Sequence, residues 1–105
     1  MDEREFNQRA DAALARVEAA LDDCAADIDY EIQPGGVIEI EFADGSKIIV
    51  NRHGAAREIW LAARSGGYHF RCEDDRWIGT RDGAELMDVL SRCASEQAGE
   101  PVELR

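Results

Sequence analysis

The spacing of apolar residues changes twice along this chain, and the change limits the fold more than any other feature of the sequence. Over residues 2–23 the apolar side chains recur every third or fourth position, uninterrupted by glycine or proline. The members of this pattern are Phe6, Ala10, Ala13, Leu14, Val17, Leu21 and Cys24. Residues at these steps share one face of a helix, so the segment predicts an amphipathic helix from about Asp2 to Asp23.

Beyond residue 29 the period falls to two, which is typical of strands with one buried face. The alternating segments are residues 30–33, 38–42, 47–51, 58–63, 68–72 and 76–79. Short turns separate them, and the Asp44-Gly45 pair tolerates the positive φ that a tight hairpin needs. Because short turns join consecutive strands, we expect an antiparallel meander.

A second helical pattern closes the chain. Asp82 is followed three residues later by Glu85, which is the spacing of a capping box and predicts a helix beginning at Asp82. Its apolar face consists of Leu86, Leu90, Cys93 and Ala94. Gly99 and Pro101 predict its end.

This order of elements predicts an α+β fold formed by a single domain over residues 1–105. We expect a two-layer α-β sandwich, with two terminal helices packed on one face of a roughly six-stranded antiparallel sheet. The other face of the sheet is then open to solvent, and residues that point out of it are available to partners.

The net charge of −11 is concentrated near the N-terminus, since residues 1–45 contain 13 acidic and 3 basic residues. Such a field disfavours nucleic acid and anionic membranes as partners, and it favours cations and basic proteins. No signal peptide pattern and no long apolar run is present, so we expect a soluble, cytoplasmic protein. Cys24, Cys72 and Cys93 are odd in number and widely spaced, which predicts free thiols.

Seven carboxylates form a candidate cation site. Asp11, Glu18 and Asp22 fall within a wedge of roughly 40° on the first predicted helix. The row continues through Asp23, Asp27, Asp29 and Glu31. Carboxylate oxygens suit hard cations, so weak metal binding is one interpretation. A docking surface for a basic protein and a merely solubilising surface are the alternatives.

Trp60 is a candidate partner contact. It alternates with Ile59 and Leu61, so it faces solvent if those two face the helices. By the same parity Asn51 points outward, and an exposed tryptophan is a preferred anchor at protein interfaces. We expect His53 to lie in a polar turn and His69 to point outward from its strand.

Six segments together resemble the bacterial, CyaY-type branch of the frataxin family. They are LDD at 21–23, DIDYEI at 27–32, EFADGSKIIVNR at 41–52, EIWLAARSGGYHF at 58–70, RWIG at 76–79 and QAGEPVELR at 97–105. The resemblance implies the sandwich described above. It also implies an acidic ridge that binds Fe²⁺ and Fe³⁺ weakly, without an organic cofactor. The matching ridge positions are Glu18, Asp22, Asp23, Asp27, Asp29 and Glu31.

The resemblance further implies a role in iron–sulfur cluster assembly as a regulator, iron sensor or iron donor. The implied partners are a cysteine desulfurase and a scaffold protein, with Asn51, Trp60 and His69 as contacts on the sheet. We expect mostly a monomer, with possible iron-dependent oligomers. The alternative is a ferroxidase or iron-storage protein. Because the Glu-x-x-His motif of di-iron helical bundles is absent, we expect a protein that is not an enzyme.

Overall fold

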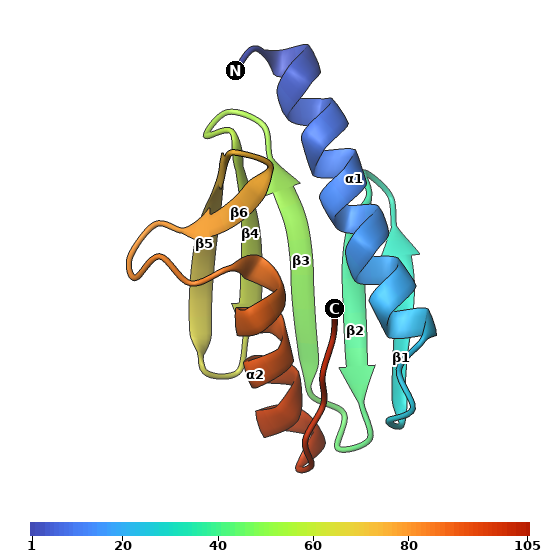
Figure 1. Cartoon of the computed structure of the whole chain (residues 1–105). Helices are drawn as coiled ribbons and strands as arrows, with labels where there is room; N and C mark the ends of the chain where they lie inside the picture. Colours follow the sequence, from blue (N-terminus) through green and yellow to red (C-terminus); the bar gives the residue numbers. More distant parts are fainter.

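The computed structural model describes all 105 residues and confirms the predicted architecture of two helices around six strands. The elements are α1 (Glu3–Asp22), β1 (Ile28–Gln33), β2 (Val37–Phe42), β3 (Lys47–His53), β4 (Glu58–Ala63), β5 (Gly66–Glu73), β6 (Arg76–Gly79) and α2 (Leu86–Ala98). The strands form one antiparallel sheet in sequence order from β1 to β6. Both helices lie on the same face of this sheet (Figure 1).

The core lies between the helices and the sheet, where the two apolar patterns meet. On β2, β3 and β4 alternate residues point toward the helices, and seven of them are at most 3% exposed. These residues are Ile38, Ile40, Phe42, Ile48, Val50, Ile59 and Leu61. Phe6 and Val17 of α1 and Leu90 of α2 are fully buried against them. The strand parity predicted from the sequence is therefore confirmed.

The start of α2 differs from the prediction. The helix begins at Leu86, with Glu85 at the N-cap and no side-chain capping bond, so the expected capping box at Asp82 is wrong. Asp82 Oδ1 instead accepts from the backbone N–H of Ala84 at 3.1 Å in a turn. Glu85 also bridges to Ile78, which keeps the preceding segment extended against β6.

The C-terminal tail packs between the two helices (Figure 1). Ser91 and Ser95 of α2 hold it, because each hydroxyl meets both the N–H and the carbonyl of one tail residue. Ser95 Oγ lies 2.8 Å from the Val102 nitrogen, and Ser91 Oγ lies 2.9 Å from the Leu104 nitrogen. Val102 and Leu104 thereby complete the core at 7% and 0% exposure.

The three cysteines are free, as predicted, and Cys93 is buried. Neither helix is long and apolar enough to cross a membrane.

Candidate functional site

The acidic ridge follows one edge of the molecule. Its members lie on the C-terminal half of α1, on the connection to β1, and on β1 itself, which is an edge strand of the sheet. Glu18 is half-buried and the other five residues are exposed. None of the six forms an ion pair with a basic side chain, so their charges are uncompensated within the chain.

Asp22 joins the two elements of the ridge. Its Oδ1 accepts a hydrogen bond from the Tyr30 hydroxyl of β1. This bond, together with burial and the nearby Glu18, raises the pKa of Tyr30 to about 12. The phenol therefore stays protonated, and it ties the end of α1 to the edge strand.

Asp11 differs from the other predicted ligands. It forms an ion pair with Arg52 of β3, so its charge is compensated. Arg52 also reaches the Asn7 side chain at 3.3 Å, which places this pair toward the N-terminal half of α1. The shared wedge predicted for Asp11, Glu18 and Asp22 therefore contains one paired and two unpaired carboxylates.

Like charges also face one another across the open face of β1 and β2. Asp29 lies opposite Glu41, and Glu31 lies opposite Glu39. Lys47 of β3 relieves part of this repulsion, because its Nζ lies 2.6 Å from Glu39 Oε1. The hydrogen bond from Lys47 holds the pKa of Glu39 below its ordinary value.

The ridge is a row of carboxylates and not a formed metal cage. No three histidine, cysteine, aspartate or glutamate side chains anywhere in the chain converge in a metal-binding arrangement. A cation at the ridge would therefore be held by one or two carboxylates, with water completing its coordination shell. Such a site is weak and selects poorly among hard divalent ions.

The open face of the sheet carries a stack of three aromatic rings. Trp60 of β4 lies between His53 and His69, with ring centroids 3.9 Å and 4.5 Å apart and interplanar angles of 7° and 9°. Asn51 and His69 flank Trp60 in the strand register. The predicted orientation of Asn51, Trp60 and His69 is correct. The turn expected at His53 is wrong, because β3 continues through that residue.

A buried carboxylate fixes this stack. Glu58 is only 6% exposed although it shares the solvent-facing side of the sheet with Trp60. Its two oxygens accept from Trp60 Nε1 at 2.9 Å and Arg71 Nε at 3.0 Å, and His69 Nδ1 lies 3.6 Å away. The Trp60 hydrogen bond lowers the pKa of Glu58, burial opposes this effect, and Arg71 reinforces it. The indole N–H is therefore already engaged, while His69 is exposed and Trp60 and His53 are half-buried.

Sequence reasoning missed His53, Glu58 and Arg71 as parts of this surface. All three have the same outward parity as Trp60, and the strand register places them in one row across β3, β4 and β5. The alternation of residues along each strand places these side chains on the outward face. Bringing them into one row also requires the register between neighbouring strands, which the alternation does not provide.

Comparison with known proteins places the chain in a family. The family described as a frataxin-like domain matches residues 1–100. The iron-sulfur cluster assembly protein CyaY of Dechloromonas aromatica is 63% identical over 105 residues, which is 100% of both chains. The chain belongs to the frataxin family.

Solved frataxins share its architecture. Frataxin from Psychromonas ingrahamii is 33% identical and superposes with a TM-score of 0.88, covering 98% of this chain and 97% of that one. Trimeric yeast frataxin from Saccharomyces cerevisiae, solved complexed with ferrous iron, superposes with a TM-score of 0.67 at 24% identity, covering 95% and 88%. At that identity the yeast protein shows the frataxin fold alone. The resemblance and the fold class predicted from the sequence are confirmed.

Proposed function

We propose that this frataxin acts in iron–sulfur cluster assembly as an iron-binding partner protein. The observation that carries the proposal is the 63% identity, along the whole chain, to a relative named for that process. The unpaired acidic ridge and the fixed aromatic stack supply two surfaces with different chemistry. Because the ridge and the aromatic stack are separate surfaces, the protein can contact more than one component of the cluster assembly system.

In this proposal the ridge binds Fe²⁺ or Fe³⁺ as cargo or as a signal, and no organic cofactor takes part. The same six charges attract a basic surface on a cysteine desulfurase, because opposite charges guide association over several ångströms. Iron and the partner then share one surface. Iron bound there reduces its negative charge, which gives a physical route from iron level to partner affinity.

Asn51, Trp60 and His69 form the second contact, toward a scaffold protein. Both helices lie on one face of the sheet (Figure 1), and the register gives these three residues the parity opposite to the buried Ile59 and Leu61, toward the uncovered face. A rigid aromatic group costs little conformational entropy when it is buried at an interface, which is why such groups dominate binding energy. The protein acts here as a mostly monomeric, non-enzymatic partner, and iron-dependent oligomers would form through the ridge.

Paramagnetic titration tests the iron site. Anaerobic Fe²⁺, or Mn²⁺ in its place, should broaden amide signals along the ridge first, because broadening depends steeply on distance from the ion. Asp22→Asn should reduce the broadening. The matched variant Asp11→Asn, on the same helix but paired with Arg52, should leave it nearly unchanged. Broadening centred on His53 and His69, with the ridge unaffected, would refute the assignment.

A further inference from the structure

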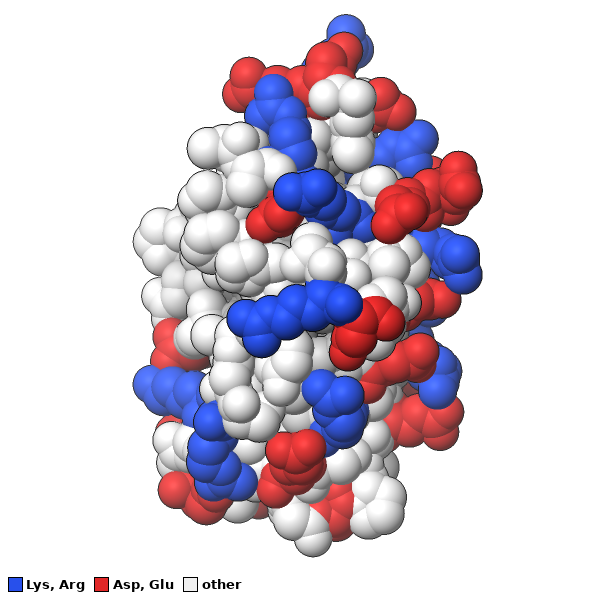
Figure 2. Space-filling model, turned by 90° about the vertical axis from the view of Figure 1, so that its left-hand side faces the viewer, with Lys and Arg blue, Asp and Glu red and all other residues white.

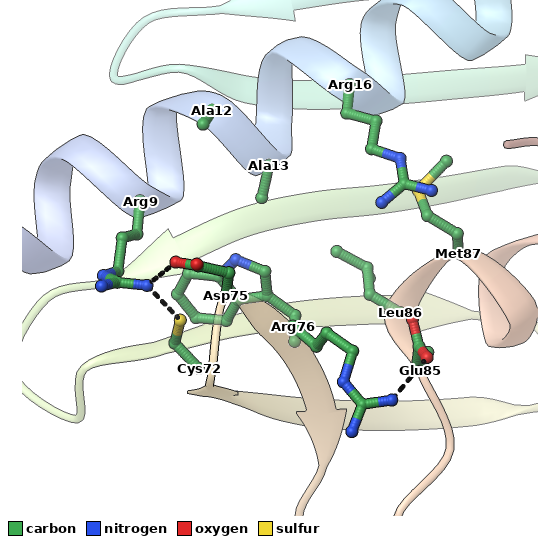
Figure 3. A pocket seen from close by; sticks show the side chains of 11 residues that line it. Arg9, Ala12, Ala13, Arg16, Cys72, Asp75, Arg76, Glu85, Leu86 and Met87 are labelled. Carbon is green, nitrogen blue, oxygen red and sulfur yellow. Dashed lines mark hydrogen bonds and ion pairs between the residues drawn. The ribbon is translucent and has the colours of Figure 1, made fainter.

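A cavity of about 320 Å³ opens between α1, the β5–β6 hairpin and the first turn of α2. Figure 3 shows its lining, with Ala12 and Ala13 of α1 on one side and Leu86 on the other. Trp77 of β6 adds a further apolar side chain to the lining. Neither the ridge nor the aromatic stack contributes a residue to it.

Small side chains leave this space unfilled. Ala13 of α1 and Cys72 of β5 line it with short side chains, and Arg9 Nη1 reaches Cys72 Sγ at 3.8 Å along one side (Figure 3). Trp77 and Leu86 are 7% and 4% exposed, so these two apolar side chains are otherwise packed into the core. Protein interiors are normally close-packed, and an apolar recess of this size is therefore a place where a ligand can replace missing contacts.

Three guanidinium groups surround the recess, but only one lacks an acidic partner. Arg9 is paired with Asp75 and, at 3.1 Å, with Glu5. Arg76 lies 3.3 Å from Glu85. Arg16 extends over the cavity from α1 (Figure 3), and no carboxylate lies within ion-pairing distance of it.

The surroundings differ from those of the ridge. On the side of the molecule that carries β5 and β6, basic and acidic side chains are interspersed over uncharged surface (Figure 2). The strong negative field of the ridge lies at the opposite edge of the sheet, on β1. An anion can therefore approach this recess although the whole chain carries a charge of −11.

We propose that this cavity binds a small organic carboxylate with a compact apolar body. The apolar part would fill the space beside Ala13, Trp77 and Leu86, and the carboxylate would pair with Arg16. A guanidinium fork matches a carboxylate in a bidentate geometry. A single negative charge fits best because Arg16 offers the one uncompensated positive charge, and Asp75 and Glu85 at the rim disfavour a dianion.

The test uses 2-naphthoate as the probe and its neutral carboxamide as the comparison, titrated into the ¹⁵N-labelled full chain. The expected shifts centre on the amides of Ala12, Ala13 and Met87 and on the Trp77 indole. The carboxylate should bind about tenfold more tightly than the carboxamide, in line with a charge-assisted hydrogen bond. Arg16→Gln should remove that tenfold preference.

Two variants make the outcome decisive. Arg4→Gln removes an equally exposed, unpaired arginine from the same helix and should leave binding unchanged. Ala13→Leu occupies part of the recess, so it should weaken binding of both probes to a similar extent. Equal affinity for the two probes, an unaltered preference in Arg16→Gln, or shifts away from the recess would each overturn the proposal. Because no partner protein or iron is present, failure here leaves the proposed role in cluster assembly untouched.

Discussion

Replacing Glu58 with glutamine tests whether the buried carboxylate stabilises the fold through Trp60. Glu58 is 6% exposed and accepts from Trp60 Nε1 at 2.9 Å. A hydrogen bond to a charged acceptor contributes about 1.5–3 kcal/mol, and a neutral one about 0.5–1.5 kcal/mol. The bond from Arg71 adds little because that side chain is 68% exposed. We therefore expect Glu58→Gln to lower the free energy of unfolding by about 1 kcal/mol at pH 7.

The pH dependence of the stability difference shows whether the charge of Glu58 is responsible for it. The folded state lowers the pKa of Glu58 below its ordinary value. Its stabilising contribution is therefore present above the unfolded pKa of about 4.3 and is lost as the pH falls through the lower folded value. The difference between wild type and Glu58→Gln should be full at pH 7 and should shrink progressively below about pH 4. For a chain of this size, 1 kcal/mol corresponds to a fall in melting temperature of about 4–8 °C.

Glu41→Gln is the matched control for thermal and urea unfolding. Glu41 faces the same side of the sheet but is exposed and forms no ion pair. Repulsion from Asp29 and attraction to Lys47, which lie opposite it on the two neighbouring strands, counteract each other, so its replacement should change stability little. The reasoning is refuted if Glu58→Gln is as stable as wild type at pH 7. A loss of stability that stays constant down to pH 3 would show that glutamine disturbs packing, and that the charge of Glu58 is not the cause.

Other outcomes follow from the two surfaces. Trp60→Ala should lower the free energy of unfolding by about 1–3 kcal/mol in thermal melts, because it loses two stacking contacts and one hydrogen bond. This is less than the roughly 3–5 kcal/mol expected for a core tryptophan, since little core contact is lost. Unchanged binding to the scaffold protein by a folded Trp60→Ala variant would exclude Trp60 as an anchor. Charge reversal of Asp22 and Asp23 to lysine should slow association with a cysteine desulfurase and flatten its salt dependence, as stopped-flow kinetics can show; unaltered rates would remove the ridge from docking. Salt should raise the melting temperature of the wild type, with divalent cations effective at lower concentration than monovalent ones, and a flat or falling midpoint would contradict a repulsive ridge.

The Trp60 prediction shows how tertiary contacts change a conclusion drawn from parity. Alternation places Trp60 on the open face, which alone predicts that its removal leaves the folded state nearly intact. The structure agrees about the face but stacks the indole between two histidines and bonds it to a buried carboxylate. Its removal therefore affects stability as well as binding.

Local sequence patterns are enough to predict the order of the elements, the inward face of β2, β3 and β4 and the place of the acidic ridge along the chain. These properties depend on local periodicity, since a change of period between 3.6 and two residues fixes which side chains share a face. The ridge follows from the same rule, because its members are neighbours along α1 and β1.

Which charges are compensated, and where a cavity remains, depends on contacts between distant segments of the chain. Asp11 meets Arg52 from 41 positions away, and Trp60 meets His53 on one side and His69 on the other because three strands pair. The start of α2 depends on the bridge between Ile78 and Glu85, and the cavity is lined by side chains from α1, the β5–β6 hairpin and α2. Local sequence patterns do not encode such contacts, because each requires two distant segments to be placed side by side before their side chains can interact.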